Sequence, residues 1–289
     1  MKVLVTGATG FTGSFVVREL LRHGFDVRCF MRPTSDVSRL PLSNVACVSG
    51  DLDEPSTLAK ALEGINVLVN VASLGFGHAQ DIVRVAEDAG VSRALFLSTT
   101  AIFTSLNAPS KAIRIQAEET IQQSNLLYTI LRPTMIYGTS QDRNISRLIR
   151  YVQRYPVLPV LGSGEYLLQP VYVQDVAKAL VQAIANEETV RQSYNIPGQT
   201  VVTFNDLVNT VARLLGRRLA LVHLPSSPCI WGLTAAESLS IGLPIKAEQI
   251  KRLNEDKSFA AEPAAQAFGY APCPLEDGLA LELEEMGIG

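Results

Sequence analysis

The chain begins with the stretch Lys2-Val-Leu-Val-Thr-Gly-Ala-Thr-Gly-Phe-Thr-Gly13, followed by a segment of helical apolar spacing over Phe15–Arg22. We predict a buried strand over Lys2–Thr6 and a helix after it, so the three glycines lie in the turn between them. Gly7 permits a tight turn, Gly10 lets backbone N–H groups approach a pyrophosphate, and Gly13 lets the helix pack close to the strand. The N-terminus of the helix adds positive partial charge. In this context the spacing predicts a dinucleotide-binding turn rather than an ordinary glycine-rich connection.

Composition describes a globular protein with a large core, because 47% of the 289 residues are hydrophobic and 18% are charged. The net charge is −3 and no run of five basic residues occurs, so we expect neither nucleic acid nor an anionic membrane as a partner. No apolar run approaches the ~20 residues that a membrane span needs.

The four cysteines (Cys29, Cys47, Cys229 and Cys273) are far apart, and the three histidines lack the spacing of metal ligands. We therefore expect reduced thiols and no metal site. The predicted first strand starts at Lys2, which leaves no room for a signal peptide. The expected location is the cytoplasm.

Strands and helices alternate through the first half of the chain. Strands are predicted over 2–6, 26–30, 45–49, 67–72, 94–98 and 128–131, and helices over 15–23, 56–62, 79–89 and 111–124. Such alternation implies right-handed βαβ units, and hence a doubly wound α/β fold whose parallel sheet is covered on both faces.

The pattern changes after about residue 135. Helices are predicted over 145–152, 175–185 and 204–215, short strands over 171–173, 193–196 and 219–222, and turns and short extended pieces over 156–164. We predict a dinucleotide-binding domain over 1–155, to which the segments around 169–185 return. Residues 156–289 would form mainly a smaller substrate-binding region.

The end of the second strand bears on the choice of cofactor. It reads Cys29-Phe-Met-Arg32, with no acidic residue to bind the ribose 2′-hydroxyl of NAD. Arg32 could instead bind a 2′-phosphate with paired donors, or it could be a solvated strand-end arginine. Asp51, followed by Leu52, could accept from the adenine amino group or simply be a turn residue. We predict NADP(H) in preference to NAD(H), which stays possible.

Further motifs follow in a fixed order: Asn70-Val-Ala-Ser73, Leu97-Ser-Thr-Thr100, Leu131-Arg-Pro-Thr-Met-Ile-Tyr-Gly138, Gln169-Pro-Val-Tyr-Val-Gln-Asp-Val-Ala177 and Tyr194-Asn-Ile-Pro-Gly198. Together with the glycine turn they resemble the extended and atypical short-chain dehydrogenase/reductase superfamily, which has a Rossmann-type fold and includes NAD-dependent epimerase/dehydratases. The segment 169–177 looks most like the branch near the 39 kDa-type NADPH-binding subunit of respiratory complex I.

The resemblance implies roles for the matching positions. Thr99 would hydrogen-bond the reacting carbonyl, although it could equally be a β-branched residue at a strand end. Ala72 and Ser73 would pass under the ribose on the nicotinamide side, and Pro133 and Thr134 would pack near the nicotinamide. The pyrophosphate would be lined by the three glycines together with Thr9, Phe11 and Thr12.

The family's catalytic Tyr-x-x-x-Lys is absent. Aligning the helix on Ala117-Glu118 places Ser110 and Arg114 at the tyrosine and lysine positions, and aligning it on Ser110-Lys111 places Asn107 and Lys111 there. Serine and asparagine do not titrate near neutral pH, and arginine stays protonated, so the usual proton relay is missing. Lys111, Tyr137 or a water molecule are candidate proton donors, although Lys111 could be a surface lysine and Tyr137 a packing residue.

The substrate side departs from nucleotide-sugar enzymes as well. Leu168-Gln-Pro170 stands where those enzymes keep an arginine for the substrate diphosphate. Four arginines recur at helical spacing: Arg143, Arg147, Arg150 and Arg154. They could form a solvated helix face, or Arg143 could contact an anionic substrate.

Two hypotheses stay open. The first is an NAD(P)(H)-dependent oxidoreductase or epimerase/dehydratase-like enzyme that acts on a small carbonyl, hydroxyl or sugar-derived compound. The second is a non-catalytic NADP(H)-binding regulator, assembly factor or accessory subunit. A homodimer or another protein partner is compatible with either.

Overall fold

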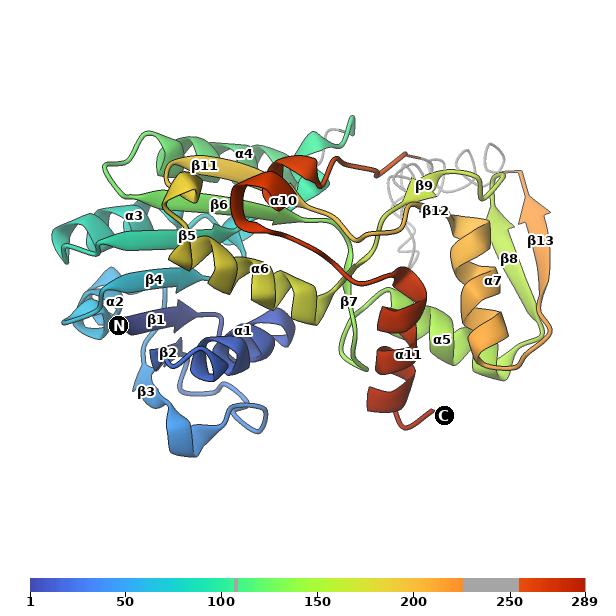
Figure 1. The fold of residues 1–289 in the computed structure, drawn as a ribbon, viewed down its shortest axis with the longest axis horizontal. Helices are drawn as coiled ribbons and strands as arrows, with labels where there is room; N and C mark the ends of the chain where they lie inside the picture. The colour runs from blue at the N-terminus through green and yellow to red at the C-terminus, as the bar shows by residue number, and fades with distance from the viewer. Residues whose placement is uncertain (107–108, 226–254, 289) are drawn as a thin grey trace, which may run out of the picture.

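The structure is a computed structural model that describes residues 1–106, 109–225 and 255–288. Asn107, which one alignment places at the tyrosine position, and Cys229 lie outside these ranges. Figure 1 shows a sheet with helices on both faces and, beyond the ends of its strands, a smaller group of helices and short strands.

The sheet has seven parallel strands in the order β3-β2-β1-β4-β5-β6-β11. Strand order reverses between β1 and β4, so the chain winds outward in both directions from that point. The predicted α/β, Rossmann-type doubly wound fold is confirmed. The strands are β1 (Lys2–Thr6), β2 (Asp26–Met31), β3 (Ala46–Ser49), β4 (Val67–Asn70), β5 (Arg93–Leu97), β6 (Tyr128–Pro133) and β11 (Gln192–Ile196).

Helices cover both faces of this sheet. One face packs against α1 (Phe11–Arg22), α6 (Val173–Ala185) and α10 (Glu262–Phe268). The other packs against α2 (Pro55–Leu62), α3 (Ala79–Asp88) and α4 (Pro109–Gln122). Central strands such as Val3–Val5 and Val67–Val69 are fully buried, which explains why they read as unbroken apolar runs without alternation.

The smaller group lies at the carboxyl ends of the strands, on the right of Figure 1. Its helices are α5 (Ile145–Arg154), α7 (Phe204–Leu214) and α11 (Leu275–Glu285). Three short strand pairs accompany them: β8 (Val157–Leu161) with β13 (Ala220–Leu224), β9 (Leu167–Leu168) with β12 (Val202–Thr203), and β7 (Ile136–Tyr137) with β10 (Val171–Tyr172). The domain division at residue 155 stays a prediction.

Some element bounds differ from expectation. Helix α1 begins at Phe11 instead of Phe15, because the extended Gly10 (φ −72°, ψ 169°) is already its N-cap residue. The segment 156–164, predicted as turns and short pieces, contains strand β8, which pairs with β13 from a distant part of the chain. The two C-terminal helices α10 and α11 were not predicted.

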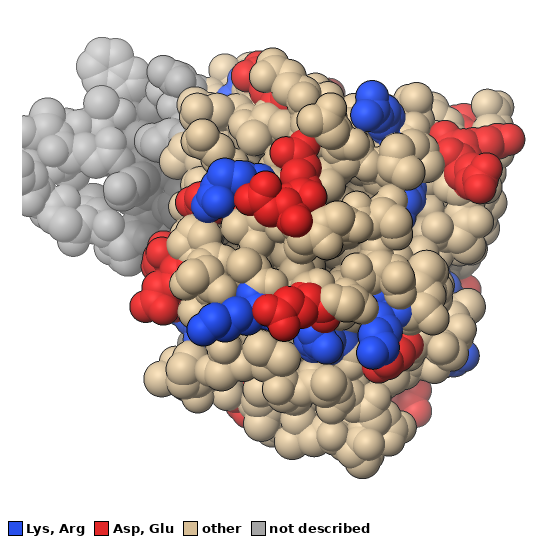
Figure 2. Space-filling view, turned by 90° about the vertical axis from the view of Figure 1, so that its left-hand side faces the viewer, with Lys and Arg blue, Asp and Glu red and all other residues tan. Residues whose placement is uncertain are grey.

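The described surface shows no single-sign field at the amino ends of the strands. Figure 2 shows this face, where basic and acidic side chains alternate. Within the described ranges, no helix is both long and apolar enough to cross a bilayer.

Candidate functional site

The glycine turn is sterically closed to side chains. Gly7 has a left-handed backbone (φ +67°), and a Cβ on it would lie 2.7 Å from the Ala72 nitrogen. A Cβ on Gly13 would lie 2.0 Å from the Gly7 carbonyl oxygen. Helix α1 therefore packs directly on the turn, with no acidic residue in its first turn and no side-chain cap at Gly10. A close-packed turn with an uncapped helix N-terminus fits a pyrophosphate.

A cavity of about 500 Å³ extends from this turn across the ends of β2 and β3. It brings together six of the predicted cofactor residues: Gly7, Thr9, Arg32, Asp51, Leu52 and Ala72. The Arg32 guanidinium makes no hydrogen bond or ion pair with any described residue. This end of the sheet has the size and donors for an adenosine moiety.

The same cavity contains residues that the sequence did not single out as cofactor ligands. Phe76 is 73% exposed beside it, and its ring lies edge-on to His78, with centroids 6.4 Å apart. The His78 Nδ1 atom lies 3.7 Å from a carboxylate oxygen of Asp53. The short turn that carries Phe76 begins at Ser73, whose side chain accepts from the Gly75 nitrogen. Turn geometry of this kind leaves no periodic signal in a sequence.

A second cavity, of about 480 Å³, begins at Thr99 and Thr134, at the carboxyl ends of β5 and β6. The Thr99 hydroxyl oxygen accepts a hydrogen bond from the Ala101 nitrogen at 3.2 Å. Because that oxygen is already an acceptor, its hydrogen is free to point to another group. We call this space the Thr99 cavity.

The two side-chain candidates for the missing proton donor face elsewhere. The Lys111 ammonium donates to the Thr104 carbonyl oxygen at 2.5 Å. Tyr137 is 1% exposed, and its hydroxyl donates to the Leu275 carbonyl at 3.3 Å. Burial above all raises the pKa of Tyr137 far above its ordinary value. Neither residue is among the described residues that line the Thr99 cavity.

A serine–arginine pair stands where one alignment places the family's tyrosine and lysine. An Nη1 group of Arg114 donates to the Ser110 hydroxyl at 3.1 Å. The guanidinium lies against Gly75, where a Cβ would be 3.2–3.4 Å from its atoms. The Arg114 guanidinium, which stays protonated, thus lies beside the turn at Gly75 that follows β4.

A buried polar network holds the ends of β5 and β6 in place behind the Thr99 cavity. Glu118 of α4 accepts from Arg132 at 2.5, 2.9 and 3.0 Å and also from the Ser98 hydroxyl. The side chains of Glu118 and Arg132 are 5% and 13% exposed. Ser98 and Arg132 immediately precede Thr99 and Pro133 in sequence, so this network fixes the two strand ends from which the cavity starts.

The segment 255–259 crosses the site and was not expected there. The Glu255 carboxylate accepts from the Thr104 hydroxyl at 2.5 Å and from the Ser105 nitrogen at 2.7 Å. Burial would raise the pKa of Glu255, but hydrogen bonds from Ser105 and Thr104 hold it below its ordinary value. The Lys257 and Phe259 nitrogens bond to Leu167 and Gln169. A sequence pattern cannot predict these contacts, because Glu255 lies about 150 residues from Thr104 and Ser105 along the chain.

Comparison with known proteins agrees with this geometry. A family model described as NAD(P)H-binding matches residues 7–187. The mitochondrial NADH dehydrogenase [ubiquinone] 1 alpha subcomplex subunit 9 of Arabidopsis thaliana is 26% identical over 275 residues, which cover 87% of this chain and 67% of that protein. The photosystem II assembly factor Ycf39 of Trieres chinensis is 24% identical over 236 residues (78% and 72%), and the ceramide reductase of Caulobacter vibrioides is 28% identical over 240 residues (77% and 73%).

A solved structure shares the fold over nearly the whole chain. The UDP-glucose 4-epimerase of Thermotoga maritima superposes with a TM-score of 0.77 at 20% identity, covering 99% of this chain and 98% of that one. The predicted resemblance to short-chain dehydrogenases/reductases of the epimerase/dehydratase type is confirmed. The chain belongs to the NAD(P)H-binding family, whose model matches residues 7–187, and it has the fold of that epimerase.

Proposed function

We propose that this protein binds NADP(H) in preference to NAD(H) and carries out hydride transfer with a small carbonyl, hydroxyl or sugar-derived compound. The observation that carries the proposal is the Thr99 cavity, which opens at the strand ends where the nicotinamide half of a cofactor is expected. The bound cofactor would supply or accept the hydride. The name of one relative, a ceramide reductase, also supports a reductase.

In this proposal Thr99 positions the substrate oxygen. Its hydroxyl accepts from the Ala101 nitrogen, so its own hydrogen can be donated to a carbonyl oxygen in the cavity. The proton that completes the reduction comes from solvent, since Lys111 and Tyr137 are engaged by the Thr104 and Leu275 carbonyls. Pro133, Thr134 and Ser73 would border the nicotinamide and its ribose.

Replacing Thr99 tests the hydride-transfer role. We expect Thr99→Ala to lower turnover about 100-fold across a panel of aldehydes, ketones and nucleotide sugars, because a single donor to a developing oxyanion contributes on that order. The Kd for NADPH is expected to stay unchanged, and Thr99→Ser, which keeps the hydroxyl, is the matched control. Full turnover in Thr99→Ala would contradict the proposal.

Arg32 tests the cofactor preference. A charge-assisted contact to a 2′-phosphate contributes about 1.5–3 kcal/mol, so Arg32→Gln is expected to raise the Kd for NADPH roughly 10- to 100-fold and leave that for NADH unchanged. Arg84→Gln is the control, since Arg84 of α3 bonds only to Asp81 and Asp88 among the described residues. An unaltered protein that binds NADH as tightly as NADPH would refute the preference.

A second candidate function is a non-catalytic NADP(H)-binding accessory or assembly protein. The observation that favours it is the Ser110–Arg114 pair, which cannot relay a proton at neutral pH. Two relatives are named as a complex I subunit and an assembly factor. Tight NADPH binding without turnover of any panel compound, together with a co-purifying protein, is the result that this candidate predicts. A cytoplasmic location stays a prediction under both candidates.

A further inference from the structure

An inner cavity of about 510 Å³ continues from the Thr99 cavity into the space bordered by α5, β9 and α7. The two spaces share Thr100, Thr134 and Met135 in their walls. A compound whose reacting oxygen lies at Thr99 can therefore extend into the inner cavity. The volume is in the range of pockets that bind drug-sized ligands.

Most of the inner wall is apolar. The Tyr166 and Phe204 rings stack at 5.6 Å between centroids and 24° between planes. Burial raises the pKa of Tyr166 to about 12, so its phenol adds no charge at neutral pH. The other apolar side chains of the wall are Met135, Ile145, Leu148, Leu168 and Leu207. Such a surface favours an apolar body over a hydrated sugar.

All charged residues of the described wall are basic: Arg143, Arg147 and Lys257. The acidic neighbours of Lys257 line the Thr99 cavity instead and are already engaged. Glu255 is bonded by Thr104 and Ser105, and Asp256 accepts from the Leu167 nitrogen at 2.8 Å. The inner cavity thus joins an apolar wall to a cationic one.

Of the four arginines that recur at helical spacing, Arg143 precedes α5 and the other three belong to it, and the four divide into two pairs. An Nη2 group of Arg150 donates to the Ser140 carbonyl at 2.8 Å, and Arg154 lies over the Tyr155 ring at 5.7 Å. Arg143 and Arg147 make no hydrogen bond or ion pair with any residue that the structure describes. The two arginines that line the cavity are therefore the two whose guanidinium groups are available to a ligand.

We infer that the substrate is an amphiphilic anion: a carbonyl or hydroxyl compound with an apolar body, which fills the inner cavity, and a carboxylate or phosphate, which Arg143 and Arg147 bind. Arg143 lies in the bend just before α5 and Arg147 in the first turn of that helix, and both line the inner cavity, so one anion there can accept from both. The inference rests on the proposed hydride transfer at Thr99, and it names the class of compound that reaches that residue.

Anilinonaphthalene sulfonate, a fluorescent amphiphilic anion, provides a direct probe of the cavity in protein saturated with NADPH. We expect Arg147→Gln to raise its Kd about 10-fold, as for the loss of one charged contact, and Arg143→Gln/Arg147→Gln to raise it further. Arg154→Gln, one charge removed from the same helix outside the cavity, should leave the Kd unchanged. The Kd for NADPH should be the same in all variants.

Competition with the probe defines the ligand chemistry. Decanoate and decyl phosphate should displace it at least ten times better than decanol, and the stronger of the two identifies the anion. The inference is overturned if the arginine variants bind the probe like the parent protein, if decanol competes equally, or if UDP-glucose displaces the probe better than decanoate. Carbonyl derivatives of the anion that competes best then test turnover. If the arginine variants weaken binding of these compounds but the parent protein does not turn them over, only the proposed hydride transfer is refuted. If the compounds are turned over equally by the parent and the arginine variants, only this inference is refuted.

Discussion

We expect Glu282→Gln to stabilise this protein at neutral pH. Glu282 of α11 is fully buried, and neither its carboxylate oxygens nor Oδ2 of Asp142 has a hydrogen-bond partner among the described residues. Burial first, and then the neighbouring Asp142 carboxyl, which can share a hydrogen bond with a protonated Glu282 and repels an ionised one, raise the pKa of Glu282 to about 10. A protonated Glu282 can donate to Asp142, which explains how two carboxyl groups face each other inside the protein.

The magnitude follows from linkage. The folded state holds a proton on Glu282 up to about pH 10, whereas the unfolded chain releases it above its ordinary pKa of 4.5. The free energy of unfolding therefore falls as pH rises above 4.5, by about 1.4 kcal/mol per pH unit, which gives about 3 kcal/mol at pH 7. A glutamine cannot ionise, and its amide can still donate to Asp142. We expect the variant to recover a gain on the order of 2–3 kcal/mol at pH 7, and little near pH 4.5.

Urea unfolding followed by circular dichroism at several pH values between 5 and 8 measures this gain by linear extrapolation. The stability of the parent should decline more steeply with pH than that of Glu282→Gln, so the two curves diverge as pH rises. Glu284→Gln is the matched control, because Glu284 is the exposed neighbour on the same helix and should leave the pH slope of the parent unchanged. Parallel curves for the parent and Glu282→Gln would refute the assignment of a protonated, buried Glu282.

Three further predictions concern the sheet and its glycine turn. Gly13→Ala should abolish NADPH binding and lower the free energy of unfolding by about 3 kcal/mol or more, because its Cβ would lie 2.0 Å from the Gly7 oxygen. Gly64→Ala is the control, because nothing lies within 4 Å of a Cβ there: it should cost only about 1–2 kcal/mol and leave the Kd for NADPH unchanged. Glu118→Gln should destabilise by about 3 kcal/mol in urea unfolding, since it leaves the buried Arg132 guanidinium without its charge partner; equal stability of parent and variant would contradict this. Arg93→Met should lower the free energy of unfolding by about 2–4 kcal/mol, because Arg93 is only 9% exposed and donates to the Thr129 and Thr189 hydroxyls and the Leu127 carbonyl. Arg93→Lys should lose less stability, since it keeps a donor. Similar stabilities of the Met and Lys variants would argue against the hydrogen bonds as the cause.

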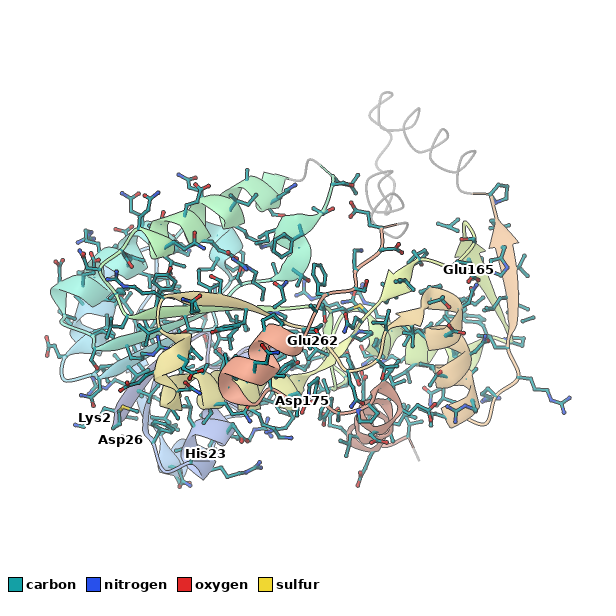
Figure 3. All side chains as sticks on the ribbon, turned by 45° about the horizontal axis from the view of Figure 1, so that its top comes forward. Lys2, His23, Asp26, Glu165, Asp175 and Glu262 are labelled. Atoms are coloured by element: carbon teal, nitrogen blue, oxygen red, sulfur yellow. The ribbon has the colours of Figure 1, made fainter. Side chains whose placement is uncertain are left out.

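The parallel sheet could be predicted from the sequence, whereas the C-terminal segment could not. The parallel sheet could be predicted because each βα unit is local and its buried strands are continuous apolar runs. Helices α10 and α11 could not, since they are held by contacts with distant parts of the chain. The Cys273 nitrogen donates to Asp175 of α6 at 2.9 Å, where the segment passes α6 on its way to α11 (Figure 3). Helix α11 can pack against Tyr137 only because residue 278 is glycine: a Cβ there would lie 2.1 Å from the Tyr137 hydroxyl oxygen and clash with it.

The cofactor end of the site could be predicted for the same reason as the sheet. Gly7, Arg32 and Asp51 each follow a strand directly, and parallel strands bring their carboxyl ends to one edge. The substrate end depends on residues whose position is set by long-range packing. Tyr137 looked available in the sequence because nothing local reveals that α11 covers it, and Glu255 reaches Thr104 from 151 residues away.

By itself the sequence determined that this chain forms a doubly wound parallel sheet with a dinucleotide turn after its first strand. Glycine spacing, apolar runs and strand-end residues are local properties, and sterics translate them directly into backbone shape. Only the tertiary structure decided which charged groups are left for ligands. Whether Arg143 and Arg147 face a cavity, whether Tyr137 is sealed in a core, and whether Glu282 meets Asp142 away from water all depend on which surfaces the second half of the chain buries against one another. Burial sets the pKa and availability of a side chain, and burial is a property of the assembled fold.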